Sequence, residues 1–368
     1  MILMTAESRA GSSKAWYTGG GDENDVVLST RVRLARNLAN FPFPDNCSDD
    51  DAERIQSLVF DSFNHVSDPD AYQAIPMKKV PEESLTILRE WGILDMPDGT
   101  GLVMKNSGEL ACTVNSVDHV RVAAFVPGLE IEHAFSVCSA VDGQLQQTLQ
   151  FAASYDFGFL TSSLYDAGSG MKTSLWVHLP SLAFTGALQD VLDTVRQREF
   201  TVKASYGFSD DALVALGKYY QISSASSFNG NEIDQIASAA AAGKYLAEQE
   251  RKARAEVLKI RPTPAYDIVY RAYAMVKYSR LISLREGVDI ISALKWGRDL
   301  NMLTGIEDTD FCALLYRIQP GHLRFLLSNG AFSFEQDVKD DPALKIDRLR
   351  SLILQEALEN TAFSRQGN

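Results

Sequence analysis

The stretch that decides the fold runs from Val26 to Pro44 and reads VVLSTRVRLARNLANFPFP. Its first half is β-branched and apolar, which favours a strand. In an extended segment, residues two apart point the same way, so Arg31 and Arg33 share one face of that strand. The whole chain is acidic, with a formal net charge of −13. The local group of arginines, with Arg36 as its third member, is therefore either a solvated face or a site for a strongly negative group.

The composition indicates a globular chain in a reducing compartment. Its 368 residues are 45% hydrophobic, enough for one large domain or two moderate ones. With 35 basic against 48 acidic residues, binding to nucleic acid or to an anionic membrane is not expected. No apolar run reaches the roughly 18 residues of a membrane helix, and the start lacks the apolar core of a signal peptide. Four scattered cysteines and five scattered histidines lack metal-ligand spacing, so we expect no metal site and a cytoplasmic protein.

Short strands with tight turns follow the opening stretch. GLVMKNSGELACTV (101–114) has two β-rich runs around Asn106-Ser107-Gly108, which predicts a hairpin. DHVRVAAFV (118–126) alternates, and TSLWVHL (173–179) is a further strand candidate. Consecutive short strands predict an antiparallel sheet. Amphipathic helices are predicted at 51–63, 186–198 and 243–260.

The clearest domain boundary is the sequence RPTP (261–264), where Thr263 can cap a helix and Pro264 can occupy its first turn. Before it, strand and helix patterns are mixed, and after it the pattern is helical almost throughout. The predicted parts are a flexible N-terminal arm (1–24), a mixed α/β domain (25–258) and an α-helical domain (262–360).

Two further features add to Arg31 and Arg33. Arg121 lies on the polar side of the alternating strand. The loop DAGSGMK (166–172) has glycines whose backbone amides can approach a phosphate, and it ends in Lys172. Each feature is weak alone, since a strand arginine is usually solvated and a Gly-Ser-Gly is usually a turn. Together they predict an anion site.

In this order, the motifs resemble the phosphagen (guanidino) kinase family, most closely its bacterial protein-arginine kinases. The segments that carry the resemblance are LSTRVRLARNL, VNSVDHVRV, LTSSLYDAGSGMKTSLWVHLP and VKASYGF, then VYRAYAMVKYSRLIS and LLYRIQPGHLRF in the helical part. The resemblance implies an α+β fold, with an antiparallel sheet flanked by helices. This is the glutamine-synthetase-like catalytic domain of guanidino kinases, followed here by an α-helical C-terminal domain.

The resemblance also implies that these arginines surround the phosphates of ATP or ADP with Mg²⁺. The matching positions are Ser29, Arg31, Arg33, Arg121, Lys172 and Lys203. The two lysines replace arginines of the family, which keeps the charge but loses the planar fork that holds two oxygens. Implied partners are a nucleotide and either protein substrates or a regulator of a kinase or protease, with a homodimer left open. The signature begins by residue 29, so we expect no preceding helical domain of the metabolite-specific members, and hence a protein substrate.

The acidic positions of the family are altered in this chain. Ser116 and Val117 stand where the family has paired glutamates, Phe208 where it has a loop glutamate, and Ser163 where it has a reactive cysteine. A guanidinium has a pKa above about 12 and becomes a nucleophile only after losing a proton. Loss of one general base costs about 10²–10⁴ in rate. No catalytic residue of the family is therefore retained, unless Asp166, Asp210 or Asp211 substitutes.

Three hypotheses follow from these residues. The first is a pseudokinase-like homologue that binds nucleotide but is weakly active or inactive, and acts by binding. The second is an active protein-arginine kinase with relocated carboxylates. The third is a structural interaction protein whose arginines are solvated, although the arginines together with the glycine loop speak against it.

A second altered motif lies in the helical part. QDVKDD (336–341) falls where the family has a phosphoarginine-binding Arg-Asp-x-x-Arg-Ala sequence. The chain keeps Asp337 but has Gln336 and Asp340 in place of the two arginines. A weak phosphoarginine site at Asp337 is therefore weighed against a solvated helix start.

Overall fold

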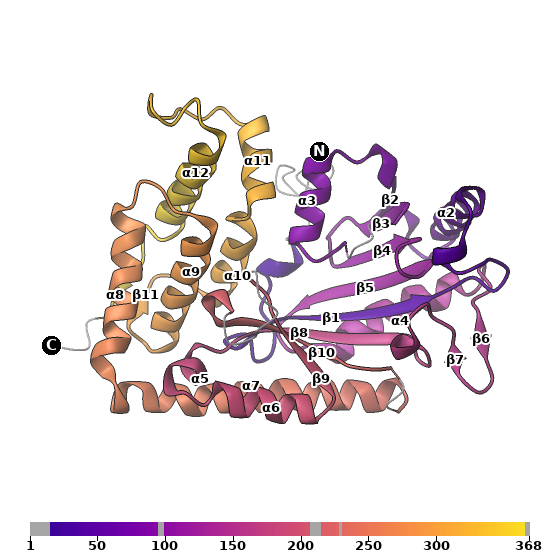
Figure 1. The fold of residues 1–368 in the computed structure, drawn as a ribbon, viewed down its shortest axis with the longest axis horizontal. Helices are drawn as coiled ribbons and strands as arrows, with labels where there is room; N and C mark the ends of the chain where they lie inside the picture. Colours follow the sequence, from indigo (N-terminus) through magenta and orange to yellow (C-terminus); the bar gives the residue numbers. More distant parts are fainter. Residues whose placement is uncertain (1–14, 95–98, 207–214, 228–229, 365–368) are drawn as a thin grey trace.

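An eight-stranded antiparallel sheet forms the first part of the molecule (Figure 1). The computed structural model describes residues 15–94, 99–206, 215–227 and 230–364. The strands, in spatial order, are β2 (Tyr72–Pro76), β3 (Gly101–Lys105), β4 (Leu110–Val114), β5 (Val120–Pro127), β1 (Val27–Arg36), β8 (Met171–His178), β10 (Tyr219–Ser224) and β9 (Phe200–Ala204). Every neighbouring pair is antiparallel, which confirms the predicted sheet.

The central strands have one apolar face and one mixed face, as their alternation predicts. Val32 and Leu34 on β1 and Val122 on β5 are buried in the main apolar core. The predicted hairpin around Asn106-Ser107-Gly108 is confirmed by β3 and β4. The opening stretch therefore supplies β1, which lies between β5 and β8 in the middle of the sheet.

Helices cover the apolar face of the sheet (Figure 1). They are α2 (Asp49–Phe63), α4 (Ile131–Leu145), α5 (Pro180–Thr185), α6 (Leu188–Gln197) and α7 (Glu232–Ile260). Helix α4 packs against β1 and β5, and α7 packs against β8. The predicted helix at 243–260 is the second half of α7, which already begins at Glu232 because Asn231 and Asp234 form a capping box. Helix α3 (Glu82–Glu90) lies on the other side, with the core under β3 to β5.

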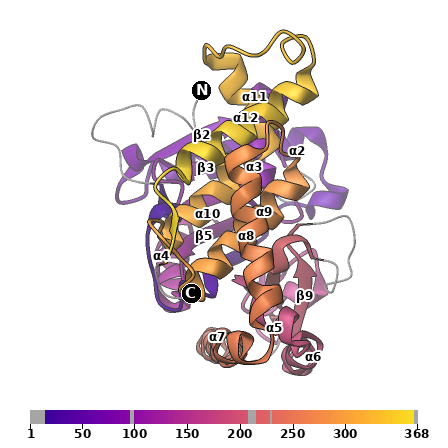
Figure 2. The ribbon, with the colours of Figure 1, turned by 90° about the vertical axis from the view of Figure 1, so that its left-hand side faces the viewer.

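The C-terminal part is helical, as predicted. It contains α8 (Pro262–Tyr278), α9 (Leu284–Asp299), α10 (Asp308–Arg317), α11 (Pro320–Asn329) and α12 (Pro342–Ala357), with a small pairing of β11 (Leu303–Thr304) and β12 (Ala362–Phe363). Figure 2 looks onto this helical part with the sheet behind it. The expected cap at Thr263 is wrong: α8 begins at Pro262, directly after Arg261, whose side chain makes no capping bond.

One of the apolar clusters crosses the join between the two parts. Leu28 on β1 and Tyr219 on β10 are buried in the same cluster as the C-terminal helices. His178 Nε2 lies 2.8 Å from Ser292 Oγ, which ties β8 to α9. The domain limits therefore stay a prediction, because packing crosses the join.

The predicted flexible arm needs a correction at its described end. Trp16–Thr18 forms a short 3-10 helix, η1, between β5 and α10. Tyr17 is 6% exposed, with its ring centroid 4.8 Å from that of Tyr316. Aromatic packing of this kind stabilises the segment in place, so the part of the predicted arm around Trp16–Thr18 is packed against the fold rather than flexible.

Candidate functional site

Four cationic side chains share the mixed face of the sheet. Arg31 and Arg33 alternate with Val32 and Leu34, so they point away from the apolar core. Arg33 pairs in register with Lys172 on β8. On the other side Arg33 pairs with Ala123 of β5, two residues from Arg121, which therefore lies on the same face. We call Arg31, Arg33, Arg121 and Lys172 the cationic face.

The charges of these four groups act on one another. Burial lowers the pKa of Lys172, and the positive charges of Arg33, Arg31 and Arg121 lower it further, while Asp166 opposes them. Arg33 and Arg121 are 7% and 6% exposed. Positive groups held this close favour an anion between them.

Two carboxylates lie in the cationic face. Asp166 Oδ2 is 3.1 Å from Arg33 Nη2, and both side chains are almost buried. Asp118 Oδ2 is 3.8 Å from Arg121 Nε. Of the three predicted substitute acids, Asp166 is thus placed at the site, while Asp210 and Asp211 lie outside the described residues.

Asp118 and its neighbour His119 hold the local geometry. Asp118 Oδ1 accepts hydrogen bonds from Asn37 Nδ2 at 3.0 Å and from the Ser162 amide at 2.8 Å. His119 Nδ1 accepts from the Leu38 amide at 3.1 Å. Burial lowers the pKa of His119, so the ring is neutral at pH 7 and suited to accept this bond. The pair fixes the end of β1 against the loop that carries Asp166.

The remaining predicted cradle residues lie further along the same face. Ser29 pairs with Trp176, which pairs with Gln221, which in turn pairs with Lys203 on the edge strand β9. Lys203 is exposed and lies three strands from β1. The structure therefore brings Ser29 and Lys203 onto the face but not into the group of four.

A polar strip joins Lys172 to Lys203. Ser174 Oγ lies 2.9 Å from Ser223 Oγ, and Gln221 Nε2 donates to Ser223 Oγ at 3.2 Å. Ser223 and Gln221 are not among the site residues predicted from the sequence. Their signal is the alternation of polar Gln221 and Ser223 with Tyr220 and Ile222 in YYQISS, which is typical of a strand with one polar face.

The altered acidic positions offer no carboxylate where they are described. Ser116 is 4% exposed and lies with Val117 in the turn between β4 and β5. Ser163 lies in the loop before Asp166, where its carbonyl accepts from Thr161 Oγ1 at 2.7 Å. Phe208 lies outside the described residues.

Arg36 does not belong to the cationic face. Its Nη2 is 2.9 Å from Asp142 Oδ2 on α4, and its Nη1 donates to the Ser169 carbonyl at 3.0 Å. Burial lowers the pKa of Arg36, although Asp142 opposes the shift. Arg36, the third arginine of the opening stretch, therefore forms a structural ion pair on the side of the sheet opposite the cationic face.

An aromatic cluster closes one end of the cationic face. Trp176 and Phe125 lie on the same side of the sheet as Arg31. The Tyr316 ring of α10 is 5.7 Å from Trp176 and 6.1 Å from Trp16, centroid to centroid. The positive charge of Arg31 acts on Tyr316, whose pKa burial raises well above its usual range. The C-terminal helices therefore form one wall of the site.

The weak phosphoarginine position lies elsewhere. Asp337 is exposed in the segment before α12. Two residues earlier, Glu335 accepts from Arg348 Nε at 3.2 Å and pairs with Arg280. Glu335 of the chain itself thus pairs with two arginines near this motif, Arg280 and Arg348.

Metal ligands do not gather in the described ranges. Between residues 15 and 364, outside the undescribed segments, no group of three His, Cys, Asp or Glu side chains is placed to hold a metal ion. In the same ranges no helix is both long enough and apolar enough to cross a bilayer.

Comparison with protein families agrees with this geometry. The family model described as ATP:guanido phosphotransferase, C-terminal catalytic domain, matches residues 54–253. The chain therefore belongs to the ATP:guanido phosphotransferase family. A second model, described as protein-arginine kinase McsB C-terminal domain, matches residues 262–367.

Two individual proteins are similar to this chain over nearly its whole length. The protein-arginine kinase of Halothermothrix orenii is 29% identical over 335 residues, which cover 90% of this chain and 95% of that protein. The protein-arginine kinase of Desulforamulus reducens is 29% identical over 345 residues, covering 92% and 96%. Together with the second family model, these relatives show that the chain is similar to protein-arginine kinases over most of its length.

Solved structures confirm the fold. The crystal structure of lombricine kinase has a TM-score of 0.54 at 18% identity and covers 69% of this chain and 76% of that one. The substrate-free duplicated taurocyamine kinase from Schistosoma mansoni has a TM-score of 0.56 at 18% identity, covering 78% and 44%. At such identities the likeness concerns the fold alone. It confirms the fold predicted for the catalytic domain.

Proposed function

We propose that this chain binds a nucleotide through its phosphates on the cationic face and transfers phosphate to arginine weakly or not at all. One observation carries the binding half: Arg31, Arg33, Arg121 and Lys172 lie on one face of the three adjacent strands β5, β1 and β8. Guanidinium groups at this density are the usual protein solution for an oligophosphate. The polar strip over Ser174 and Ser223 gives the rest of the nucleotide a hydrogen-bonding floor.

Magnesium would enter with the nucleotide. The described side chains form no three-ligand metal site, and Mg²⁺ is commonly held by substrate phosphates, one or two carboxylates and water. Asp118 and Asp166 are the carboxylates of the cationic face that fit such a shared role. The ion would neutralise charge that develops on the transferred phosphoryl group.

We expect weak phosphate transfer because of how the arginine acceptor must be held and deprotonated. An arginine acceptor must be held near the γ-phosphorus and must lose a proton as it attacks. Ser116 and Val117 can neither hold a cation by charge nor accept that proton. We therefore infer a binding or regulatory role in the cytoplasm, with a protein as the partner.

One observation favours an active enzyme instead. Asp166 lies 3.1 Å from Arg33, inside the cationic face, where a carboxylate could accept the proton in place of the family glutamates. In that case the chain is a protein-arginine kinase with a relocated base. The two candidates differ in turnover and agree in nucleotide binding.

Transfer of radiolabelled phosphate from ATP to an arginine-rich unfolded protein, scored as acid-labile label, separates them. We expect little or no label with the unchanged chain, and recovery when Ser116, Val117 and Phe208 become glutamate and Lys172 and Lys203 become arginine. Turnover by the unchanged chain that is lost in both Asp166→Asn and Arg31→Ala would instead establish the relocated base.

A further inference from the structure

The two arginines that β1 places on the cationic face are held by different parts of the chain. Arg33 pairs with Asp166, whose carboxylate oxygen lies 3.1 Å from its guanidinium. Arg31 is half-buried, and its Nη1 donates to the carbonyl of Gly92 at 3.1 Å. Gly92 follows directly after the end of α3, so this helix supplies a fixed acceptor for Arg31.

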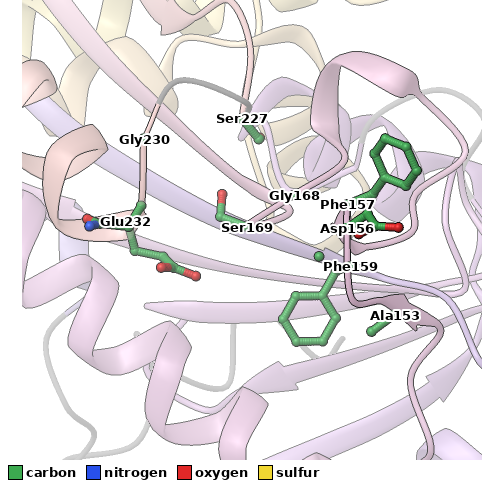
Figure 3. A pocket seen from close by; sticks show the side chains of 11 residues that line it. Ala153, Asp156, Phe157, Phe159, Gly168, Ser169, Ser227, Gly230 and Glu232 are labelled. Carbon is green, nitrogen blue, oxygen red and sulfur yellow. The ribbon is translucent and has the colours of Figure 1, made fainter.

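The loop that holds Arg33 leads away from α3. Gly168 and Ser169, two and three residues after Asp166, line a cavity of about 500 Å³ (Figure 3). Its other walls are the hairpin of β6 (Ala153–Ser154) and β7 (Gly158–Phe159) and the start of α7. None of the described lining residues comes from α3, so the supports of the two arginines are separate.

The end of α3 is a rigid helix stop. The Gly92 amide donates to the Arg89 carbonyl at 2.9 Å, and the Ile93 amide donates to the Leu88 carbonyl at 3.0 Å. Gly92 has φ +68°, and this combination is a Schellman motif with glycine in the left-handed region. The carbonyl of Gly92 shares its peptide group with the Ile93 amide. The bond to Leu88 therefore also fixes the direction of the carbonyl that Arg31 contacts.

Glu90, in the last turn of α3, ties this end to the helical C-terminal part. Its Oε1 and Oε2 accept from the Gly321 amide at 2.8 and 3.1 Å. Gly321 lies in the first turn of α11, where the N-cap residue Gln319 makes no side-chain capping bond. A carboxylate at a helix N-terminus satisfies an amide that the helix leaves open and interacts favourably with the helix dipole. Glu90 therefore caps α11 from another part of the chain.

The contact between α3 and α11 is close. A Cβ on Gly321 would lie 2.7 Å from Glu90 Oε2 and 3.1 Å from Thr86 Cγ2, so glycine is needed for this approach. Burial raises the pKa of Glu90, while the Gly321 amide and the positive charges of Arg324 and Arg350 oppose the shift. The surroundings on α11 and α12 thus favour a charged carboxylate at this position.

Three consecutive residues, Glu90–Gly92, therefore contact three different partners, and we call them the α3 end. Between the cap of α11 and the bond to Arg31, the ring of Trp91 lies 5.7 Å from that of Tyr17 and 6.1 Å from that of Tyr316, centroid to centroid. Because the α3 end is rigid, a change in its docking on α11 would also move the carbonyl that holds Arg31.

A held arginine is better prepared for an anion than a mobile one. A guanidinium has five N–H donors, so one bond to a neutral carbonyl leaves donors for a phosphate. An arginine that is already ordered also loses less conformational entropy when the anion binds. The bond to Gly92 should therefore favour phosphate binding by Arg31 rather than compete with it.

We propose that Glu90 is a positioning residue of the phosphate site: by capping α11 it fixes Gly92, and Gly92 orients Arg31. This role rests on the proposed binding of nucleotide phosphates by Arg31. It adds that the helical C-terminal part contributes to that binding without contacting the phosphates.

The test is a double-mutant cycle on the full chain, with affinity for inorganic tripolyphosphate measured by calorimetry. Glu90→Ala should weaken binding about fivefold, and Arg31→Ala about tenfold or more. If Glu90 acts through Arg31, adding Glu90→Ala to Arg31→Ala should cause no further loss, whereas adding it to Lys172→Met should again weaken binding about fivefold. A residue that only stabilised the fold would cause the same loss in both backgrounds, and that result would overturn the proposal.

A second variant breaks the same contact from the other side. Gly321→Ala keeps the charge of Glu90 but displaces it with the added Cβ, so it should also weaken tripolyphosphate binding about fivefold. Glu90→Gln keeps an acceptor for the Gly321 amide and should retain most of the affinity. If Glu90→Ala does not fold, Gly321→Ala takes its place in the cycle. Unchanged affinity in folded Gly321→Ala would contradict the positioning role.

The matched control is Glu286→Ala. Glu286 Oε2 accepts from the Ser283 amide at 2.9 Å and so caps α9 in the same helical part, away from α3. Its loss should leave tripolyphosphate affinity unchanged, and a loss equal to that of Glu90→Ala would show that any weakened cap in this part has the same effect. The proposed function fails with a different result: Arg31→Ala would then bind tripolyphosphate as tightly as the unchanged chain, and both proposals would fall. If Arg31→Ala weakens binding while Glu90→Ala and Gly321→Ala do not, only the positioning role is wrong.

Discussion

Two lysines of this chain lie in opposite surroundings. Lys295 on α9 is fully buried where the helical part meets the sheet, with its Nζ 3.0 Å from Asp299 Oδ2 and 3.3 Å from Asp308 Oδ1. It also donates to the Asp25 carbonyl at 2.6 Å. Lys172 on β8 is half-buried beside three arginines, and in the described part of the chain it makes no ion pair.

The two clusters respond differently to their own charge. Burial and neighbouring arginines lower the pKa of Lys172. Beside Lys295, burial alone would lower the pKa of Arg298, but Asp308 and Asp299 outweigh it and raise that pKa. The carboxylates of the cluster around Lys295 therefore favour the charged form of Arg298, whereas the surroundings of Lys172 oppose its charged form. A cation kept against its neighbours indicates a ligand that is bound in function rather than a contact that stabilises the fold.

The largest effect that this comparison predicts is on stability. Lys295→Met should lower the free energy of unfolding by about 3 kcal/mol, because it leaves Asp299 and Asp308 buried without one of their cations. Denaturant unfolding measures the change. The matched control is Lys252→Met, whose partner Glu248 is 61% exposed; an exposed pair contributes about 0–1 kcal/mol. If the two variants lost the same free energy of unfolding, the buried cluster would contribute no more to stability than an exposed ion pair.

A change to methionine at Lys172 should affect nucleotide binding rather than stability. Lys172→Met removes a cation that its neighbours oppose, so the free energy of unfolding should stay within about 0.5 kcal/mol or rise. Affinity for magnesium-ADP should fall about tenfold, since a charged hydrogen bond contributes about 1.5–3 kcal/mol. Calorimetry and denaturant unfolding on the same samples test both halves. Lys244→Met, which removes an exposed lysine of α7, is the control.

If Lys172→Met destabilised the chain as Lys295→Met does, the cationic face would be a structural cluster. If affinity were unchanged while stability held, the phosphates would lie elsewhere on the face, and Lys203 on β9 would be the next position to change.

The sequence predicts one of these two clusters and misses the other. Arg31 and Arg33 alternate in a strand, and alternation alone places them on one face, so the cationic face was within reach of local patterns. The cluster around Lys295 joins Asp25, α9 and α10 across some 280 positions of the chain. No local pattern records which helix packs on which strand, so that cluster required the structure.

The bounds of helices and strands also divide into those that local sequence patterns predict and those that only the structure shows. The strand at Val120–Pro127 and the hairpin before it were predicted because alternation and a tight turn are local signals. The first turns of α7 were missed because residues 232–242 are rich in alanine and lack an amphipathic stripe, while a capping box sets the start. Likewise the sequence groups Arg36 with Arg31 and Arg33, but only the structure shows its pairing with Asp142 on α4, on the opposite side of the sheet.

Removing the charge of Asp166, which pairs with Arg33, has the smallest expected effect. It should raise the affinity for phosphate, whereas Lys172→Met should lower it. These residues are 133 positions apart, with the carboxylate oxygen 3.1 Å from the guanidinium. In the cationic face this carboxylate competes with a phosphate for Arg33. Asp166→Asn keeps the size and a hydrogen-bond acceptor but removes the charge, so affinity for inorganic tripolyphosphate should rise about threefold to fivefold, or about 0.7–1 kcal/mol.

Magnesium-ADP sharpens this last prediction, because Asp166 can act on it in two ways. If the carboxylate only competes with phosphate, Asp166→Asn should raise the affinity for magnesium-ADP as much as that for tripolyphosphate measured without metal. If Asp166 also holds the ion through water, the gain should appear with tripolyphosphate alone and vanish or reverse with magnesium-ADP. Asp193→Asn, which removes an exposed carboxylate on α6, controls for the change in net charge. A loss of affinity for both ligands in Asp166→Asn would show that the ion pair builds the cationic face rather than competing for it.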